Sequence, residues 1–292
     1  MEWIILILGA GFFFSLNHIF RKKILEDVNV LDMMICTGTF GFLIVLPFFR
    51  FVEFSISLWN LFLIILNTAF AFGGSFLLNM AYKKCEISTV SPLLNINPLF
   101  VIALSYFMLG EILTVIQFIG VMLILIGGYI LTLADIRLFF YPFTSLPKKY
   151  FITVLSTLVL WSFCPVINRI VLQDVDSFSY MFFFVMFIFL IQIVLIVLKN
   201  RFQDVIMLAR KKWYLLVITS LFWIVSDFLH LAAIEVPAAV VSLVMPVKRL
   251  SNLMTVILGG ALFKERNLAV KSTACVLMVA GLFIIGLGVK NS

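Results

Sequence analysis

The stretch RKKILEDVN at residues 21–29 reappears as NRIVLQDVD at residues 168–176, which lie 147 positions later. Both copies keep the Leu, Asp and Val at matching places, but the second copy has one basic residue where the first has three. A repetition over so long an interval predicts that the fold is built from two copies of one unit.

Two further pairs of stretches extend this match through the chain. SPLLNINPLFVIALSYFMLGE at 91–111 aligns with MPVKRLSNLMTVILGGALFKE at 245–265 at an offset of 154. FGGSFLLNMA at 72–81 aligns with WIVSDFLHLA at 223–232 at an offset of 151. Because the offset changes only between these blocks, we expect the unit to comprise about half of the protein.

The composition is that of a membrane protein. Of 292 residues, 64% are apolar and 12% are charged, whereas soluble domains average about 45–50% and 25%. Runs of 18–25 apolar residues are long enough to cross a hydrocarbon core of about 30 Å as helices. We predict an all-α membrane protein with ten such spans, at 3–20, 31–49, 57–81, 87–109, 114–134, 150–168, 178–198, 213–234, 238–262 and 268–288.

The number of spans in each copy determines how the copies are oriented. Five spans is an odd number, so the second copy must enter the membrane from the opposite face, as in the inverted repeats of many secondary transporters. We predict a first five-helix repeat at 1–134, a central linker at 135–149 and a second five-helix repeat at 150–292.

The distribution of basic residues supports inverted copies and predicts an orientation. Arg21, Lys22 and Lys23 follow the first span, whereas Arg169 alone follows its counterpart, and the other equivalent loops also reverse. One face carries sixteen Lys and Arg and the other carries three. Cytoplasmic loops retain basic residues, so we expect both termini outside a cell membrane, plasma or inner. The net charge of +7 then requires no nucleic-acid partner.

The sequence lacks the signatures of an enzyme. It contains no Gly-rich phosphate loop after a strand, no nucleophile elbow and no His/Glu metal motif, and its four cysteines are scattered without metal or redox spacing. We therefore expect no catalytic residues, no cofactor and no metal site.

The chain resembles the drug/metabolite transporter superfamily in its EamA-like form. The resemblance rests on the ten spans in two repeats and on the Pro-containing spans that end at Gly110-Glu111 and Lys264-Glu265, each followed by a Gly-bearing span. It implies a secondary carrier, such as an antiporter, that works by alternating access around a cavity lined by the first, third and fourth spans of each repeat. Many relatives are drawn with cytoplasmic termini, whereas the charges here favour the reverse.

Lys248 and Arg249 are the main candidates for substrate binding. Each charge inside a membrane costs at least about 2.5–3.5 kcal/mol on insertion scales, so charges found there are functional candidates. The pair follows Pro246 within the span 238–262, and the first repeat has Leu94 and Asn95 at these positions. The pair resembles the one with which plastid phosphate translocators are thought to hold phosphate. Alternatively, either cation forms a structural pair with an intramembrane acid.

Asp227 is the acid available for such a pair. Helical spacing gathers it on one stripe with Trp223, Ser226 and His230. Asp227 either balances one of the two cations or couples transport to protons together with His230, whose ordinary pKa near 6.5 suits that role. Trp223 is a candidate for substrate contact.

Isolated amides in the apolar spans complete the candidate site, because polar groups in lipid require partners. We assign substrate binding to Asn17, Asn79, Asn95 and Asn252, although some of these amides are equally suited to join neighbouring helices.

Three functions remain open from the sequence. The preferred one is a carrier or exchanger of a small anionic, phosphorylated organic solute, working in the lipid bilayer with a monomer sufficient and a dimer possible. The second is an exporter of amino acids or other neutral or zwitterionic metabolites. The third is a lipid-linked phosphate flippase, or a membrane scaffold that transports nothing.

Overall fold

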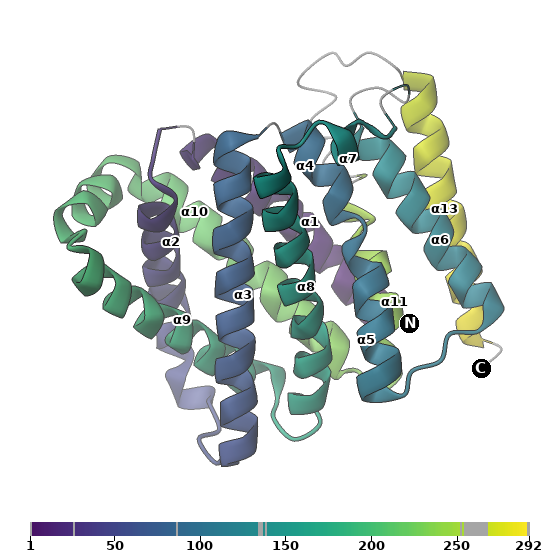
Figure 1. Ribbon diagram of the computed structural model, residues 1–292. Helices are drawn as coiled ribbons and strands as arrows, with labels where there is room; N and C mark the ends of the chain where they lie inside the picture. Colours follow the sequence, from purple (N-terminus) through teal and green to yellow (C-terminus); the bar gives the residue numbers. More distant parts are fainter. Residues whose placement is uncertain are drawn as a thin grey trace.

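A computed structural model describes residues 2–25, 27–85, 87–133, 137, 139–251, 253 and 268–290. Within them the chain is all-α (Figure 1), as predicted. The helices are α1 (Glu2–Leu25), α2 (Val30–Val45), the 3-10 helix η1 (Leu46–Phe51), α3 (Leu58–Lys84), α4 (Ile87–Leu94), α5 (Asn97–Leu109), α6 (Val115–Thr132), α7 (Tyr141–Thr144), α8 (Lys148–Val171), α9 (Ser177–Lys199), α10 (Phe202–Glu235), α11 (Val241–Lys248) and α13 (Leu268–Lys290).

Eight spans of the described chain are long and apolar enough to cross a membrane. They correspond to the first eight predicted spans, with α2 and η1 forming one and α4 and α5 another. The tenth predicted span is α13, whereas the ninth, at 238–262, begins with α11 and continues beyond the described residues. The fold is therefore that of a multi-pass helical membrane protein.

The predicted basic loop between the seventh and eighth spans is largely helical. α10 begins at Phe202, eleven residues before the predicted span, and its backbone departs from helical geometry only at Lys212, where φ is −125° and ψ is 24°. The segment before this kink contains exposed Ile206 and Met207 between charged residues. Such a mixture of apolar and charged residues lowers the average hydropathy, so a prediction from hydropathy alone assigns the segment to a loop.

Two spans are broken at equivalent places. The first break separates α4 from α5 at Asn95 and Ile96, where the N–H of Asn95 bonds to the carbonyl of Pro92 three residues earlier. The second ends α11 at Lys248, and the N–H of Arg249 bonds to the carbonyl of Pro246 in the same way. In both copies a proline lies inside the helix three residues before the residue at which the helix is interrupted, Pro92 before Asn95 and Pro246 before Arg249.

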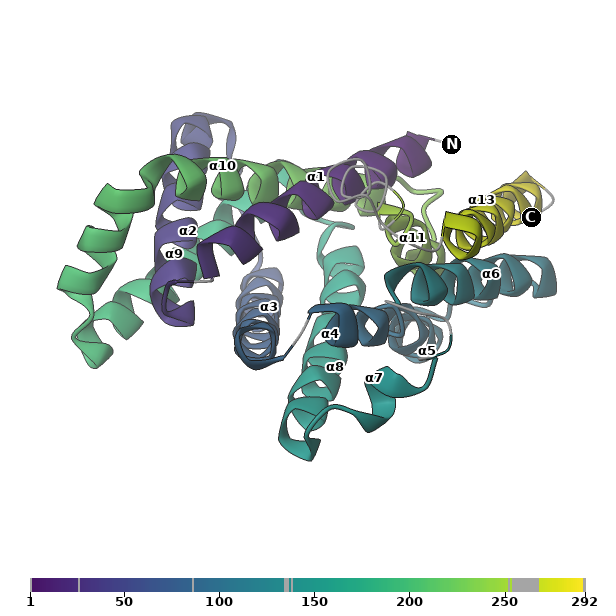
Figure 2. The same ribbon diagram turned by 90° about the horizontal axis from the view of Figure 1, so that it is seen from above.

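Helix pairings relate the two halves. α1 packs against α10 and α3 packs against α8, while α2 pairs with α9, α5 with α11, and α6 with α13. Seen from above, the α1–α10 pair and the α3–α8 pair lie on opposite sides of the molecule, with α2 and α9 toward one end and α6 and α13 at the other (Figure 2). A two-fold rotation that exchanges the first and second halves would generate this pattern of pairs.

The contact between α6 and α13 illustrates the same relation at the level of residues. A Cβ added to Gly120 would lie 2.8 Å from the carbonyl oxygen of Gly281, and one added to Gly127 would lie 2.8 Å from the carbonyl oxygen of Ala274. At the offset of 154, Gly120 aligns with Ala274 and Gly127 with Gly281, so the two contacts are equivalent. Small residues at these crossings let the helix backbones approach closely.

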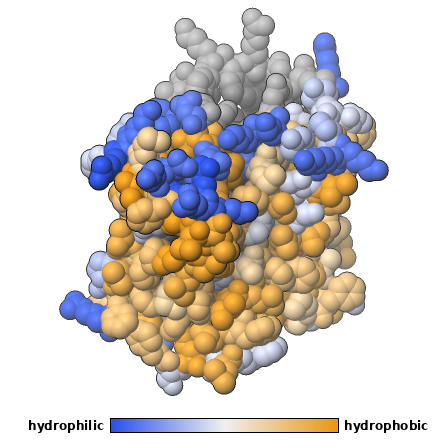
Figure 3. Space-filling model, turned by 60° about the vertical axis from the view of Figure 1, so that its left-hand side comes forward, coloured by the Kyte–Doolittle hydropathy of each residue, from blue (hydrophilic) through white to orange (hydrophobic). Residues whose placement is uncertain are grey.

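The surface matches a lipid environment. Large apolar side chains are exposed on several helices, among them Leu58 at 86% and Phe107 at 80%. Figure 3 shows a broad apolar surface with hydrophilic residues gathered toward one end. Exposed Lys83 and Lys84 end α3, and exposed Lys148 and Lys149 begin α8, and both of these helix ends lie at the top of the molecule in Figure 1.

Candidate functional site

A cavity of about 220 Å³ lies inside the helix bundle. Its lining side chains come from α1, α2, α3, α5, α8, α9, α10 and α11, and none of the described residues of α6 or α13 contributes. The cavity is therefore lined by helices of both halves, and transporters with internal repeats bind their substrates at such an interface between repeats.

Lys248 and Arg249 line this cavity at the point where α11 ends. Lys248 is the last residue of α11, and its Nζ lies 5.0 Å from the ring centroid of Phe14 on α1. Arg249 donates a 3.4 Å hydrogen bond from Nη2 to Oδ1 of Asn97, the first residue after the equivalent break. Both breaks therefore meet at the cavity.

Asp227 also lines the cavity, and its carboxylate accepts a hydrogen bond from an indole. Trp223 donates a 2.6 Å hydrogen bond from Nε1 to Oδ2 of Asp227, one helical turn further along α10. Lys248 acts electrostatically on Asp227, although no ion pair joins them in the described structure. The acid is thus near one cation without neutralising it by direct contact.

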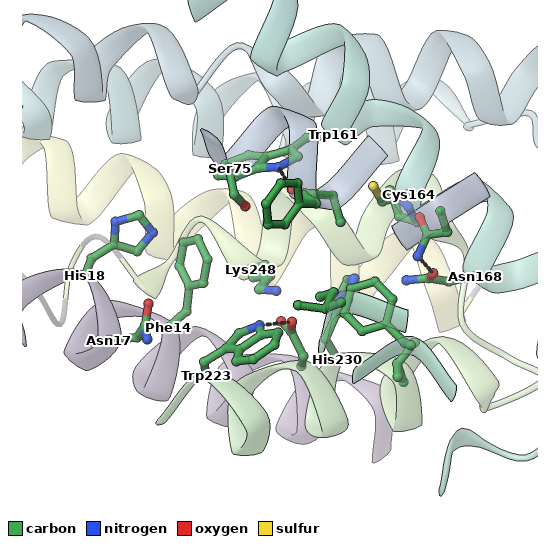
Figure 4. Close-up of a pocket in the computed structure, with 18 of the residues that line it drawn as sticks. Phe14, Asn17, His18, Ser75, Trp161, Cys164, Asn168, Trp223, His230 and Lys248 are labelled. Atoms are coloured by element: carbon green, nitrogen blue, oxygen red, sulfur yellow. Dashed lines mark hydrogen bonds between the residues drawn. The ribbon is translucent and has the colours of Figure 1, made fainter. Parts of the chain in front are cut away.

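A third cation lines the cavity on α1. Arg21 lies one turn beyond Asn17 and His18, and all three residues line the cavity. Asn17 donates a 2.8 Å hydrogen bond to the carbonyl oxygen of Thr219 on α10, so its amide joins two helices. In Figure 4, His18 and Asn17 lie on one side of Lys248. We call Arg21 and His18 the basic end.

The opposite end of the cavity is neutral and hydrogen-bonded. Asn67 donates from Nδ2 to Oδ1 of Asn168 at 3.0 Å and to the hydroxyl of Tyr180 at 2.7 Å, and Tyr180 donates to Oδ1 of Asn168 at 2.7 Å. We call these three residues the amide–phenol cluster. Asn168 and His230 lie on the side of Lys248 away from His18 (Figure 4).

The structure brings together six of the predicted site residues around the cavity: Asn17, Trp223, Asp227, His230, Lys248 and Arg249. It does not place Asn95 or Asn79 there. Asn95 donates to the carbonyl oxygen of Gly128 at 3.0 Å and to Thr132 at 3.1 Å, which joins the break to α6. Asn79 is fully buried outside the cavity lining. Asn252 lies outside the described residues.

Sequence reasoning missed the amide–phenol cluster and the position of Arg21 in the cavity. Arg21 was assigned to a cytoplasmic loop, whereas α1 continues to Leu25. The repeat contained a usable signal, because Arg21 aligns with Asn168 at the offset of 147. Asn67 was also visible as a polar residue in an apolar span, yet its two partners lie 101 and 113 residues away in the chain.

The fold and the cavity together define a multi-pass membrane protein in which two helix breaks meet at a central cavity. Residues 1–133, slightly less than half of the chain, match the model of the EamA-like transporter family.

Two individual proteins are also similar to the chain. An uncharacterized protein of Methanocaldococcus jannaschii is 44% identical over 62 residues, which are 21% of this chain and 45% of that protein. The match thus spans less than half of that relative. A solved structure described only as a crystal structure of a protein superposes with a TM-score of 0.76 at 15% identity and covers 99% of this chain and 98% of its own, which supports the fold alone.

Proposed function

We propose that the protein is a secondary carrier or exchanger that moves a small anionic, phosphorylated organic solute across a cell membrane by alternating access. The match to a transporter family over residues 1–133 supports the class, and the superposition supports the fold over the whole chain. A single chain contains both copies of the unit, so a monomer is sufficient in this proposal.

The charge of the cavity is the observation that carries the choice of substrate. Three cations line it, Arg21, Lys248 and Arg249, against one acid among the described lining residues, Asp227. None of the three cations forms an ion pair within the described chain. Cations held in a bundle without acids are costly, and an anionic substrate offsets that cost.

Phosphate suits the geometry of the donors. A guanidinium presents a planar fork of N–H groups that grips phosphate or carboxylate at two points, and an ammonium adds a compact charge beside it. Lys248 and Arg249 are adjacent residues at a helix break, where the backbone turn brings both into the cavity lining. In our proposal Arg249 holds the anion and Lys248 adds charge, while Asp227 balances part of the excess.

A zwitterionic substrate is the second candidate, and one observation favours it. Asp227 lines the same cavity as Arg249, so an amino acid would have a carboxylate for its ammonium and a guanidinium for its carboxylate. In this reading the ammonium would bond to Asp227 beside the indole of Trp223, which occupies only Oδ2 of the carboxylate.

The repeat organisation belongs to the same proposal. We place one unit at 1–134, the linker at 135–149 and the inverted unit at 150–292. The equivalent breaks at Asn95 and Arg249, and the equivalent crossings of α6 and α13, support this division. Rocking one unit against the other would then expose the cavity to each side in turn.

Competition during uptake tests the substrate class. Liposomes that contain the purified protein are loaded with a phosphate monoester. Uptake of the labelled monoester is then measured with an excess of the unlabelled monoester, inorganic phosphate, a monocarboxylate or a neutral amino acid outside. We expect phosphate and the unlabelled monoester to inhibit uptake and the amino acid to have no effect. Inhibition by the amino acid alone would reject an anionic cargo and favour the zwitterion.

A further inference from the structure

α10 is longer than a membrane span requires. Its 34 residues would extend about 50 Å as one straight helix, whereas the hydrocarbon core is about 30 Å thick. The predicted span at 213–234 alone covers about 33 Å. Residues 202–212, which end at the departure from helical geometry at Lys212, are therefore not needed to cross the membrane. We call residues 202–212 the surface segment.

One face of the surface segment packs against the protein. Leu208 is 8% exposed and belongs to a hydrophobic cluster that includes residues of α1 and α2. Ion pairs hold both ends of the segment, since Arg201 lies 2.5 Å from Asp32 on α2 and Lys212 lies 3.6 Å from Asp27. These contacts fix the rotation of the segment about its axis, so its opposite face points away from the protein.

Apolar and basic side chains share this outward face. Phe202 and Met207 are 62% and 65% exposed, and Ile206 is 38% exposed. Arg210 and Lys211 are also exposed, about one helical turn further along. Residues four positions apart lie on the same side of a helix, as Phe202, Ile206 and Arg210 do. A shallow depression of the surface is bordered by Gln203, Ile206, Met207, Arg210 and Lys211.

The outward face carries positive charge that the described chain does not neutralise. Neither Arg210 nor Lys211 forms an ion pair within the described residues. The acid of the segment, Asp204, lies 3.1 Å from Arg201 and is already paired. Lys199, at the end of α9, is a further exposed cation without an ion pair in the described part of the chain. An anionic partner would therefore find several free cations beside exposed apolar side chains.

Aromatic side chains mark the level of the segment in the membrane. Trp213 and Tyr214 follow it directly and are 59% and 51% exposed, and such residues collect where the membrane meets water. The start of α10 lies at the left-hand edge of the molecule in Figure 1 and in Figure 2. In Figure 3, where that edge comes forward, hydrophilic side chains form a band above a broad apolar surface. The outward face of the segment thus lies where lipid headgroups meet the protein.

We propose that the outward face of the surface segment binds anionic lipid headgroups. The headgroup phosphate lies against Arg210 and Lys211, and the upper part of the acyl chains lies along Ile206 and Met207. Charge complementarity favours an anionic lipid over a second copy of the chain, because a two-fold contact would bring the same cations together. This surface lies outside the cavity lining, so the bound lipid does not depend on the identity of the cargo.

Quenching of tryptophan fluorescence by brominated lipids tests this surface. Trp59→Phe removes the other exposed tryptophan, so Trp213, beside the segment, is the exposed tryptophan that remains. The protein is placed in nanodiscs that contain phosphatidylglycerol and phosphatidylcholine, with one or the other lipid brominated, and the relative affinity of the two lipids is obtained from the quenching. We expect phosphatidylglycerol to be preferred about tenfold to thirtyfold, or about fivefold for each of two cations, and high salt to lower the preference.

A charge variant assigns the preference to the surface segment. Arg210→Gln combined with Lys211→Gln should lower the preference to about threefold or less and leave quenching by phosphatidylcholine unchanged. The matched control, Lys83→Gln combined with Lys84→Gln, removes two exposed cations from the end of α3 and should keep the preference. Melting curves check the fold of both double variants, and the comparison of the two lipids in the Trp59→Phe protein does not depend on them.

Each other outcome overturns the proposal. Equal affinity for the two lipids would mean that the cations do not select an anionic headgroup. A preference that survives in a folded Arg210→Gln, Lys211→Gln variant would mean that other charges cause it. Quenching by neither lipid would mean that lipid does not reach this face, and a dimer detected by mass in the same nanodiscs would then identify a second copy as the occupant.

Discussion

The indole of Trp223 donates a 2.6 Å hydrogen bond to Oδ2 of Asp227, so the acid found among the described cavity residues has a neutral donor on its own helix. Arg249 instead bonds to the amide oxygen of Asn97. The structure thus gives no support to an ion pair between Arg249 and Asp227, and the cation that acts on Asp227 is Lys248. The relation between these charges can be tested directly.

We expect Asp227→Asn to tighten anion binding by a few-fold, because it removes the one negative charge that we count against three cations. Combining it with Lys248→Gln should leave binding weaker than in the unmodified protein, since the anion site has lost a charge. Dissociation constants and melting temperatures for the two single variants and the double variant give the coupling energy. If the double variant restored both stability and transport, Lys248 and Asp227 would be a structural pair.

The same variant separates charge balance from proton coupling. If Asp227 only balances charge, Asp227→Asn should retain uptake whether or not a pH gradient is imposed across the liposome. His230→Gln is measured in the same way, because the coupling hypothesis requires a titrating side chain at position 230 as well. Loss of gradient-driven uptake with exchange preserved would assign coupling to these residues.

Arg249→Gln should weaken binding of the anion by about ten- to a hundredfold, the loss of charge-assisted hydrogen bonds worth roughly 1.5–3 kcal/mol. Arg249→Lys should stay impaired, because an ammonium cannot reproduce the two-point grip of a guanidinium. The fold should survive the neutral substitution, since the equivalent break in the first half has Asn95 at this place. Unchanged affinity in Arg249→Gln would remove this residue from the binding site.

Glu111 should stabilise the contact between α5 and α11. Its carboxylate accepts hydrogen bonds from the backbone N–H groups of Val241 and Ser242, both at 2.8 Å, and from the hydroxyl of Ser242 at 2.6 Å. Glu111→Ala leaves these donors unpaired, and we expect a loss of about 1.5–3 kcal/mol in unfolding free energy. Glu53→Ala, at an exposed position, is the control and should leave the melting temperature unchanged.

Gly120→Ala should destabilise the crossing of α6 and α13. The added Cβ would lie 2.8 Å from a backbone oxygen of Gly281, so the helices must separate, at a cost of about 1–3 kcal/mol. Gly286→Ala on α13 meets nothing within 4 Å and should be neutral or slightly stabilising, because alanine favours helix. Equal melting temperatures for the two variants would mean that this crossing is not close-packed.

Cysteine labelling tests the orientation. In a variant without native cysteines, Cys placed at Ser145 or Gln203 should be shielded from an impermeant thiol reagent in intact cells, and Cys placed at Ser55 should be labelled. All three positions are exposed on the protein surface, so access depends on the side of the membrane. The opposite pattern would mean that both termini are cytoplasmic, as they are drawn in many relatives.

The sequence alone determined the all-α membrane fold and pointed to Lys248, Arg249 and Asp227. The fold prediction is confirmed, and the three residues line one cavity. Both inferences can be made from sequence because their physical causes act on single residues or short runs: a span needs a certain length of apolar residues, and a charge in lipid is costly wherever it lies. The stretches at 21–29 and 168–176 likewise align without any knowledge of contacts.

Only the tertiary structure decided which polar groups share the cavity. Helix rotation and packing turned Asn67 toward Asn168 and Tyr180, extended α1 so that Arg21 lines the cavity, and turned Asn95 toward α6. Hydropathy assigns a position along the membrane normal but not a direction around the helix axis. Whether an amide joins two helices or borders a cavity depends on that direction, and therefore on every helix that packs beside it.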